Sequence, residues 1–179
     1  MNLIETAMRI AVVAHKDQVR KTDGSPYVVH PIMVGYMIEK YGFPQEVVAA
    51  AITHDVLEDT TMTETSLQDE LGGTVAAIVK AVSEDKALEW EERKKRYIET
   101  VVHGGEHVWA VSAADKIHNS LSLIDAHQIL GSEVWTKFRR NKQESLWFLR
   151  TLCNRLKEVW IHPILVEFES VVARLEKLE

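Results

Sequence analysis

The sequence predicts an all-α fold, with one multi-helix domain over residues 1–179. Apolar residues recur at three- and four-residue steps almost throughout the chain, which is the pattern of helices that each bury one face. β-branched pairs such as Val28-Val29 are too short and too isolated to build a sheet. A chain of 179 residues supports one sizeable core, and no repeat, low-complexity tract or linker divides it.

Glycine and proline residues separate the expected helices. The first helix begins near Leu3, and the second begins at His30 and ends near Gly42. Residues 20–30 lie between them, lack helical spacing and predict a turn-rich loop. The remaining helices are expected at 44–57, 63–72, 74–83, 87–102, 106–127, 132–160 and 163–178, and those within 132–178 complete the bundle.

The composition excludes several classes of function. A net charge of −6 argues against binding to nucleic-acid polymers, which need a broad basic surface. The single cysteine, Cys153, excludes an internal disulfide and a Cys-rich zinc site. No apolar run approaches the roughly 20 residues of a membrane span, and no signal-peptide pattern is visible. We therefore expect a cytoplasmic protein without a membrane partner.

The stretch 53–60 carries most of the chemical information. On a helix, residues four apart share a face, so His54 would lie near Glu58, and Asp55 near Asp59. Carboxylates packed this closely repel each other unless a cation compensates them. The apolar run 47–52 just before them should cross the core and deliver these groups to a pocket. Taken alone, the stretch fits a metal site and a solvated helix end equally well.

Two further segments favour the metal site. His30 precedes a proline at a junction between loop and helix. Asp115 lies in a helix that is otherwise rich in Val, Ala, Ile and Leu, and a buried Asp needs a partner. Asn119 and Ser122 continue the same polar stripe at four and seven residues from Asp115.

The candidate ligands are His30, His54, Asp55 and Asp115. Two imidazoles and two carboxylates suit one divalent first-row cation that keeps positions open for water and substrate. A closed structural zinc site would favour thiolates instead. Manganese is our first choice of metal, although zinc would also bind such ligands.

The order H…HD…D resembles the HD-domain phosphohydrolase superfamily. Segments 14–21, 24–31, 54–60 and 114–119 resemble the hydrolase domain of RelA/SpoT homologues. Segments 82–86 and 92–94 look like the small stand-alone metazoan SpoT homologues, and the likeness spans roughly 3–160. The resemblance implies an HD-domain bundle. It also implies a manganese-dependent enzyme that removes the 3′-pyrophosphate from purine alarmones such as ppGpp or ppApp.

The resemblance also implies roles for individual residues. Glu58 and Asp59 match the acidic pair that orients and activates the attacking water. Arg20, with Lys21, matches a basic loop that packs against the purine base. The polar positions that line the nucleotide pocket are matched by Asn119 and Ser122. From its charge alone, Lys86 is a further candidate contact for the distal phosphates.

Some positions depart from the family pattern. Leu121 and Ser83-Glu84 differ at places that bear on phosphate and base contacts, so the choice between guanine and adenine stays open. Two alternatives remain: an HD-type nucleotidase or phosphodiesterase on another nucleotide, including an NADPH phosphatase, and a non-catalytic alarmone-binding domain. A monomer and a homodimer are equally compatible with the sequence.

Other conspicuous side chains are interpreted as structural. His15 is expected to bond the loop that follows it. The tryptophans of the C-terminal helices, Trp135, Trp147 and Trp160, are expected to pack between helices rather than stack on a base.

Overall fold

The computed structural model describes residues 2–137 and 140–179, and every regular element in them is helical. The only pairing of β type in this part is an isolated bridge between Val19 and Pro26. The prediction of an all-α fold is confirmed. The elements are α1 (Leu3–Ala14), α2 (Val29–Lys40), α3 (Gln45–Ile52), α4 (Val56–Asp59), α5 (Glu64–Leu71), α6 (Gly73–Val82), α7 (Trp90–His103), α8 (Glu106–Leu130), the 3₁₀ helix η1 (Gly131–Lys137), α9 (Lys142–Val159) and α10 (Pro163–Glu176).

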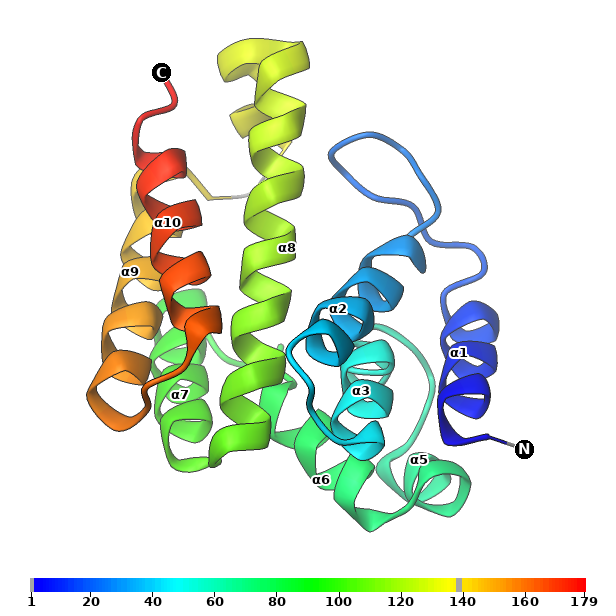
Figure 1. Cartoon of the computed structure of the whole chain (residues 1–179). Coiled ribbons are helices and arrows are strands. Elements are labelled where there is room, and N and C mark those ends of the chain that lie inside the picture. Colours follow the sequence, from blue (N-terminus) through cyan, green and yellow to red (C-terminus); the bar gives the residue numbers. More distant parts are fainter. Residues whose placement is uncertain (1, 138–139) are drawn as a thin grey trace.

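The long helix α8 runs through the middle of the molecule (Figure 1). Helices α2 and α3 pack on one side of it, with α1 beyond them, and α7, α9 and α10 lie on the other side. Helix α8 has no exposed face over 110–117: Ala110, Ala113, Ala114 and Ile117 are fully buried, and only Lys116 is partly exposed. A helix segment buried on all sides runs through the core. The buried carboxylate of Asp115 therefore lies near the centre of the fold.

Helices α2 and α3 pack closely because Gly35 has no side chain. A Cβ at this position would lie 2.4 Å from Cγ1 of Ile52, which is itself buried. That distance is far below ordinary van der Waals contact. The close approach brings the first residues of α2, including His30, beside the end of α3, where His54 follows.

The expectation of one helix over 44–57 is wrong. Helix α3 ends at Ile52, residues 53–55 form a turn, and α4 is a separate single turn. The hydroxyl of Thr53 donates to the carbonyl of Ala49 at 2.8 Å, and Thr53 leaves the helical region with φ −114° and ψ 11°. Side-chain bonds of this kind compete with the helical pattern and often bend or end a helix.

The expectation of one helix over 132–160 is also wrong. The chain forms η1 over Gly131–Lys137, and α9 begins only at Lys142. The start of α9 is fixed by a capping box in which Asn141 and Glu144 bond each other's backbone N–H groups.

Among residues 2–137 and 140–179, no helix combines the length and the apolar character needed to cross a membrane.

Candidate metal and nucleotide site

Two histidines present buried ring nitrogens to one point between α2, α3 and α8. Nδ1 of His54 lies 2.8 Å from the carbonyl of Ala51, and since a carbonyl only accepts, this nitrogen carries the ring proton. In the neutral ring, the lone pair of Nε2 is then free. Nε2 of His30 and Nε2 of His54 are both buried and have no hydrogen-bond partner of acceptable geometry among the described residues. Orphaned nitrogens of this kind are what a metal ion needs.

Carboxylate oxygens complete the cluster. Oδ1 of Asp115 lies 3.1 Å from Nε2 of His30 and 3.5 Å from Nε2 of His54. Ligand atoms of these three residues all lie within 4.8 Å of one another, so they could hold a metal ion. Asp55 is not part of this mutually close group. Its Oδ2 nevertheless lies 3.1 Å from Nε2 of His54 and 3.6 Å from Nε2 of His30, on the same side of both rings.

Both carboxyl groups are held in the ionised form. Burial by itself would raise the pKa of Asp115, but the Lys116 ammonium, 2.6 Å from its Oδ2, and the two imidazoles hold that pKa well below its usual value. Burial likewise opposes ionisation of Asp55, and the charge of His54 beside it keeps the pKa of Asp55 low. The site therefore concentrates negative charge where a cation would neutralise it.

Two residues that sequence reasoning did not assign support this cluster. Nδ1 of His118 lies 2.8 Å from Nδ1 of His30. Burial, followed by the electrostatic effect of His30, lowers the pKa of His118 to about 4, so this ring is neutral and its Nδ1 can accept a hydrogen bond from Nδ1 of His30. The hydroxyl of Tyr27 donates to Oδ2 of Asp55 at 2.5 Å. Tyr27 lies three residues before one candidate ligand and His118 three residues after another, and this spacing was the available signal.

The acidic pair lies on the single turn α4. Glu58 accepts a hydrogen bond from the backbone N–H of Glu84 at 3.0 Å. Burial raises the pKa of Glu58, and the neighbouring carboxylates of Glu84, Asp55 and Asp59 raise it further. Asp59 forms an ion pair with Lys86. A buried carboxyl group with a raised pKa is a stronger base than an exposed one.

A cleft of about 1130 Å³ opens next to this pair. Among the described residues that line it, one is acidic, Asp59, and seven are basic: Arg20, Lys21, Lys86, Arg93, Lys94, Lys116 and Arg140. The net charge of the chain is −6, so the cleft reverses the sign of the molecule locally. A cavity with basic walls attracts a polyanion of small size.

The structure brings most of the candidate substrate residues together in this cleft. Arg20 donates to the side chain of Asn119 at 2.9 Å and lies 5.7 Å from the ring centroid of Tyr27. Lys21 also lines the cleft. Ser122 is not in the lining, because it lies on another side of α8 and its hydroxyl donates to the carbonyl of His118 at 2.9 Å.

Aromatic residues line the same cleft. Trp135 is one of them, so it is not a purely internal packing residue as the sequence suggested, and Trp90 is another that sequence reasoning passed over. The guanidinium of Arg140 lies 5.1 Å from the Trp90 ring centroid. As expected, His15 bonds the following loop: its Nδ1 lies 2.8 Å from Oε1 of Gln18.

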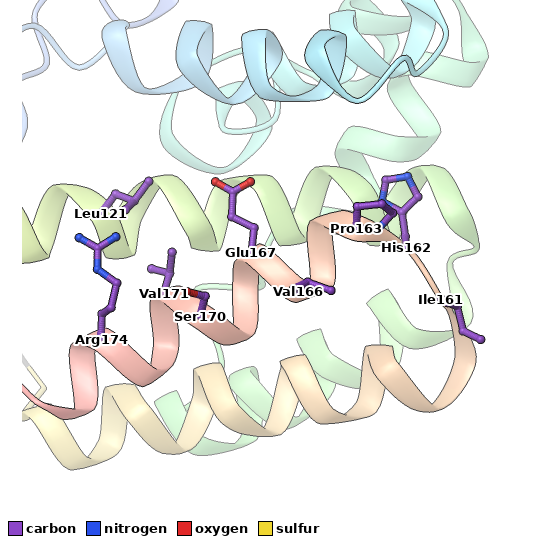
Figure 2. Close-up of a pocket in the computed structure, with 9 residues that line it drawn as sticks. All are labelled: Leu121, Ile161, His162, Pro163, Val166, Glu167, Ser170, Val171 and Arg174. Carbon is purple, nitrogen blue, oxygen red and sulfur yellow. The ribbon is translucent and has the colours of Figure 1, made fainter.

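A second groove, of about 730 Å³, lies between α8 and α10 (Figure 2). Its lining is mainly apolar, with Leu121 on one side and Val166 on the other. The charged groups in its lining are Arg174 and Glu167, and the hydroxyl of Tyr41 donates to Glu167 at 2.5 Å. None of the residues predicted to bind substrate or activate water lines this groove, whereas Asp59, Arg20 and Asn119 line the basic cleft, which is therefore the candidate nucleotide site.

Comparison with known proteins places the chain in a family. A family model described as HD domain matches residues 7–143. The chain belongs to the HD-domain family. The HD-domain match includes all four candidate metal ligands, the acidic pair and the basic residues of the cleft up to Arg140.

Individual relatives lie within the same family. Over 120 residues, this HD-domain chain is 38% identical to the guanosine-3′,5′-bis(diphosphate) 3′-pyrophosphohydrolase MESH1 of Danio rerio, an alignment that covers 65% of this chain and 66% of the relative. It is 35% identical over 153 residues to the guanosine-3′,5′-bis(diphosphate) 3′-pyrophosphohydrolase of Haemophilus influenzae, covering 82% of this chain and 21% of that longer protein. The chain thus spans about two thirds of the first relative and about a fifth of the second.

A solved structure shares the fold. The structure of a metazoan ortholog of SpoT, described as hydrolysing ppGpp, superposes with a TM-score of 0.83 at 24% identity. The superposition covers 97% of this chain and 96% of that one, so the helical arrangement described above is that of a solved structure over nearly its whole length.

Proposed function

We propose that this HD-domain protein is a metal-dependent hydrolase that removes the 3′-pyrophosphate from a purine nucleotide alarmone, (p)ppGpp, (p)ppApp or both. The observation that carries the proposal is the junction of two features. A buried cluster of metal-ligand type lies beside a cleft whose walls are basic in an acidic protein. The names of the Danio rerio and Haemophilus influenzae relatives support the same reaction and the guanine nucleotide.

In this proposal His30, His54, Asp55 and Asp115 hold one divalent cation, and we propose manganese. The mixed nitrogen and oxygen ligands suit a first-row ion of this kind. When bound, the cation lowers the pKa of a water molecule and offsets charge on the phosphoryl oxygens. The buried, unpartnered Nε2 atoms of both histidines support the fit of these residues to a metal.

Glu58 is proposed as the general base and Asp59 as its partner in orienting the water. The water oxygen forms a bond to phosphorus, and the bond from phosphorus to the ribose 3′ oxygen breaks. The Glu58 carboxylate takes the proton of the water, and the leaving 3′ oxygen takes up a proton from solvent to become the 3′ hydroxyl. The raised pKa of Glu58 supports this role, because a base works best when its pKa approaches the working pH. Phosphoryl transfer otherwise needs mainly alignment and charge stabilisation.

The nucleotide is proposed to enter the basic cleft beside Arg20. The planar guanidinium of Arg20 is held by Asn119 and by the ring of Tyr27, so it can offer a fixed face to a purine base. Lys21 follows on the same loop, has no ion pair among the described residues, and is available to a phosphate.

The test is a substrate panel with separate product assays. The purified protein is incubated with ppGpp, ppApp and NADPH in manganese, magnesium or zinc, and pyrophosphate and orthophosphate are measured separately. We expect pyrophosphate from ppGpp or ppApp in manganese, and loss of turnover in Glu58→Gln with metal binding retained. Orthophosphate release from NADPH or other nucleotides alone would instead assign another nucleotidase. Tight alarmone binding without turnover would identify a sensor domain.

A further inference from the structure

The helix that carries Glu58 and Asp59 cannot hold its own shape. Helix α4 has four residues, and one helical turn is not stable by itself because nucleation costs more than one hydrogen bond returns. The carbonyls at the end of a helix also lack helical partners. A base in such a turn needs bonds from elsewhere in the fold to keep one orientation.

Gln18 supplies one of these bonds. Its Nε2 donates to the carbonyl of Asp59 at 2.8 Å, across 41 residues of sequence. Because this carbonyl can only accept, Nε2 is the donor atom of Gln18, and the amide oxygen Oε1 accepts from Nδ1 of the buried His15 at 2.8 Å. The backbone carbonyl of Gln18 accepts from the N–H of Tyr27 at 2.9 Å. Gln18 therefore joins the loop after α1 to the acidic turn.

Lys86 supplies the other bond. Its Nζ donates to the carbonyl of Glu58 at 3.0 Å, forms an ion pair with Asp59, and lies 3.6 Å from Oε1 of Glu58. The backbone N–H of Glu84, two residues earlier, bonds the Glu58 carboxylate. Arg93 and Lys94 of α7 in turn hold the side chain of Glu84. The loop after α6 is thus bonded to α7 through the side chain of Glu84, and to the acidic turn α4 through Lys86 and the backbone of Glu84.

We propose that Gln18 and Lys86 are positioning residues that clamp the Glu58–Asp59 turn, one from the loop after α1 and one from the loop after α6. This inference rests on the proposed function of Glu58 as the base. Each clamp residue fixes one of the last two carbonyls of α4. The ammonium group of Lys86 already contacts Glu58 and Asp59. Lys86 therefore affects catalysis by positioning this turn, and not by binding a phosphate directly.

The clamp has a kinetic consequence that a phosphate contact lacks. Loss of either bond lets the base drift, and a displacement of about 1 Å at a reacting group can cost roughly 10²-fold in rate. We expect the effect to fall on kcat, because the lost bonds hold the base, whereas Arg20 and Lys21, the proposed nucleotide contacts of the cleft, stay in place. Loss of a phosphate contact would instead raise KM with kcat largely kept.

The experiment compares five variants with wild type. Gln18→Met and Lys86→Met keep side-chain length and remove the bonds, Gln18→Glu keeps the acceptor for His15 but loses the donor, and Lys86→Arg keeps a donor. Gln68→Met is the control, because Gln68 is exposed on α5 and does not line the cleft. Turnover of ppGpp and ppApp, manganese affinity, and hydrogen exchange of peptides covering 56–61 are measured, with thermal unfolding to verify folding.

We expect kcat to fall on the order of 10²-fold in Gln18→Met, Gln18→Glu and Lys86→Met, with KM and metal affinity near wild type. Lys86→Arg should recover most of the activity. Exchange over 56–61 should quicken in the three impaired variants and not in Gln68→Met. A raised KM with unchanged kcat in Lys86→Met, or unchanged exchange in all variants, would overturn the clamp. Wild type that hydrolyses neither alarmone refutes the proposed function alone, and the exchange data still decide the clamp.

Discussion

The close contact between α2 and α3 at Gly35 predicts how a change in helix spacing would affect stability and the candidate metal site. In Gly35→Ala, the new Cβ would lie 2.4 Å from Cγ1 of Ile52. Carbon atoms at optimal separation are about 3.5–4.0 Å apart, so one helix must move by roughly 1 Å. Ile52 cannot swing away, because the overlapping atom is next to its branched Cβ and the residue is 1% exposed. We expect the substitution to force the two helices apart.

The magnitude follows from two opposing effects. Overpacking a well-filled core costs about 1–3 kcal/mol, and the size of this overlap favours the upper end. Alanine in place of glycine inside a helix stabilises the folded state by about 1 kcal/mol. The net loss is then about 2 kcal/mol in the free energy of unfolding. For a chain of this length that corresponds to a fall in Tm of about 4–8 °C.

The same displacement should weaken metal binding, because His30 lies on α2 and His54 follows α3. Thermal unfolding and manganese titration of Gly35→Ala measure both effects. Gly73→Ala is the matched control: a Cβ there meets nothing within 4 Å, and stability should stay the same or rise. In the Ile52→Ala background the overlapping atom is gone, so adding Gly35→Ala should cost little. Wild-type stability and manganese affinity in Gly35→Ala would refute the reasoning.

The remaining predictions concern the polar groups of the site. Manganese at about 100 times its Kd should stabilise the wild type by about 2.7 kcal/mol in thermal unfolding, and Asp115→Asn should lose this gain. Tyr27→Phe removes the bond to Asp55 and should weaken manganese binding about 10–100-fold by titration, with the fold intact. Burial raises the pKa of Glu58, so the folded chain binds that proton more tightly than the unfolded chain, and the ionised form costs stability above the folded pKa. Glu58→Gln should therefore raise the Tm of the chelator-treated protein at neutral pH, and the gain should vanish below about pH 4, where wild-type Glu58 is protonated in both states.

Residue type and spacing predicted the helices and the ligand cluster because both depend on short-range pattern. Helical periodicity located α1 and α8, and ligand chemistry identified His30, His54 and Asp115. The interruption of the helix at 53–55 was not predicted, since it depends on the Thr53 hydroxyl bonding the carbonyl of Ala49 instead of water. The start of α9 could have been predicted from the sequence, because Asn141 and Glu144 have the spacing of a capping box.

The partners that hold the site escaped prediction for a more general reason. Three of the four candidate ligands use one polar atom to bond the fold and turn another toward the metal position: His54 bonds a main-chain carbonyl, His30 bonds His118, and Asp115 bonds Lys116. A ligand must be of a particular residue type, whereas any donor or acceptor at the right place can orient it, including backbone. The supporting atoms are therefore specified by the fold and not by residue type. Substitution of such a supporting residue should lower the affinity for the metal, although every ligand remains in place. That is why loss of manganese affinity in variants outside the H…HD…D pattern is the sharper test of how this site is built.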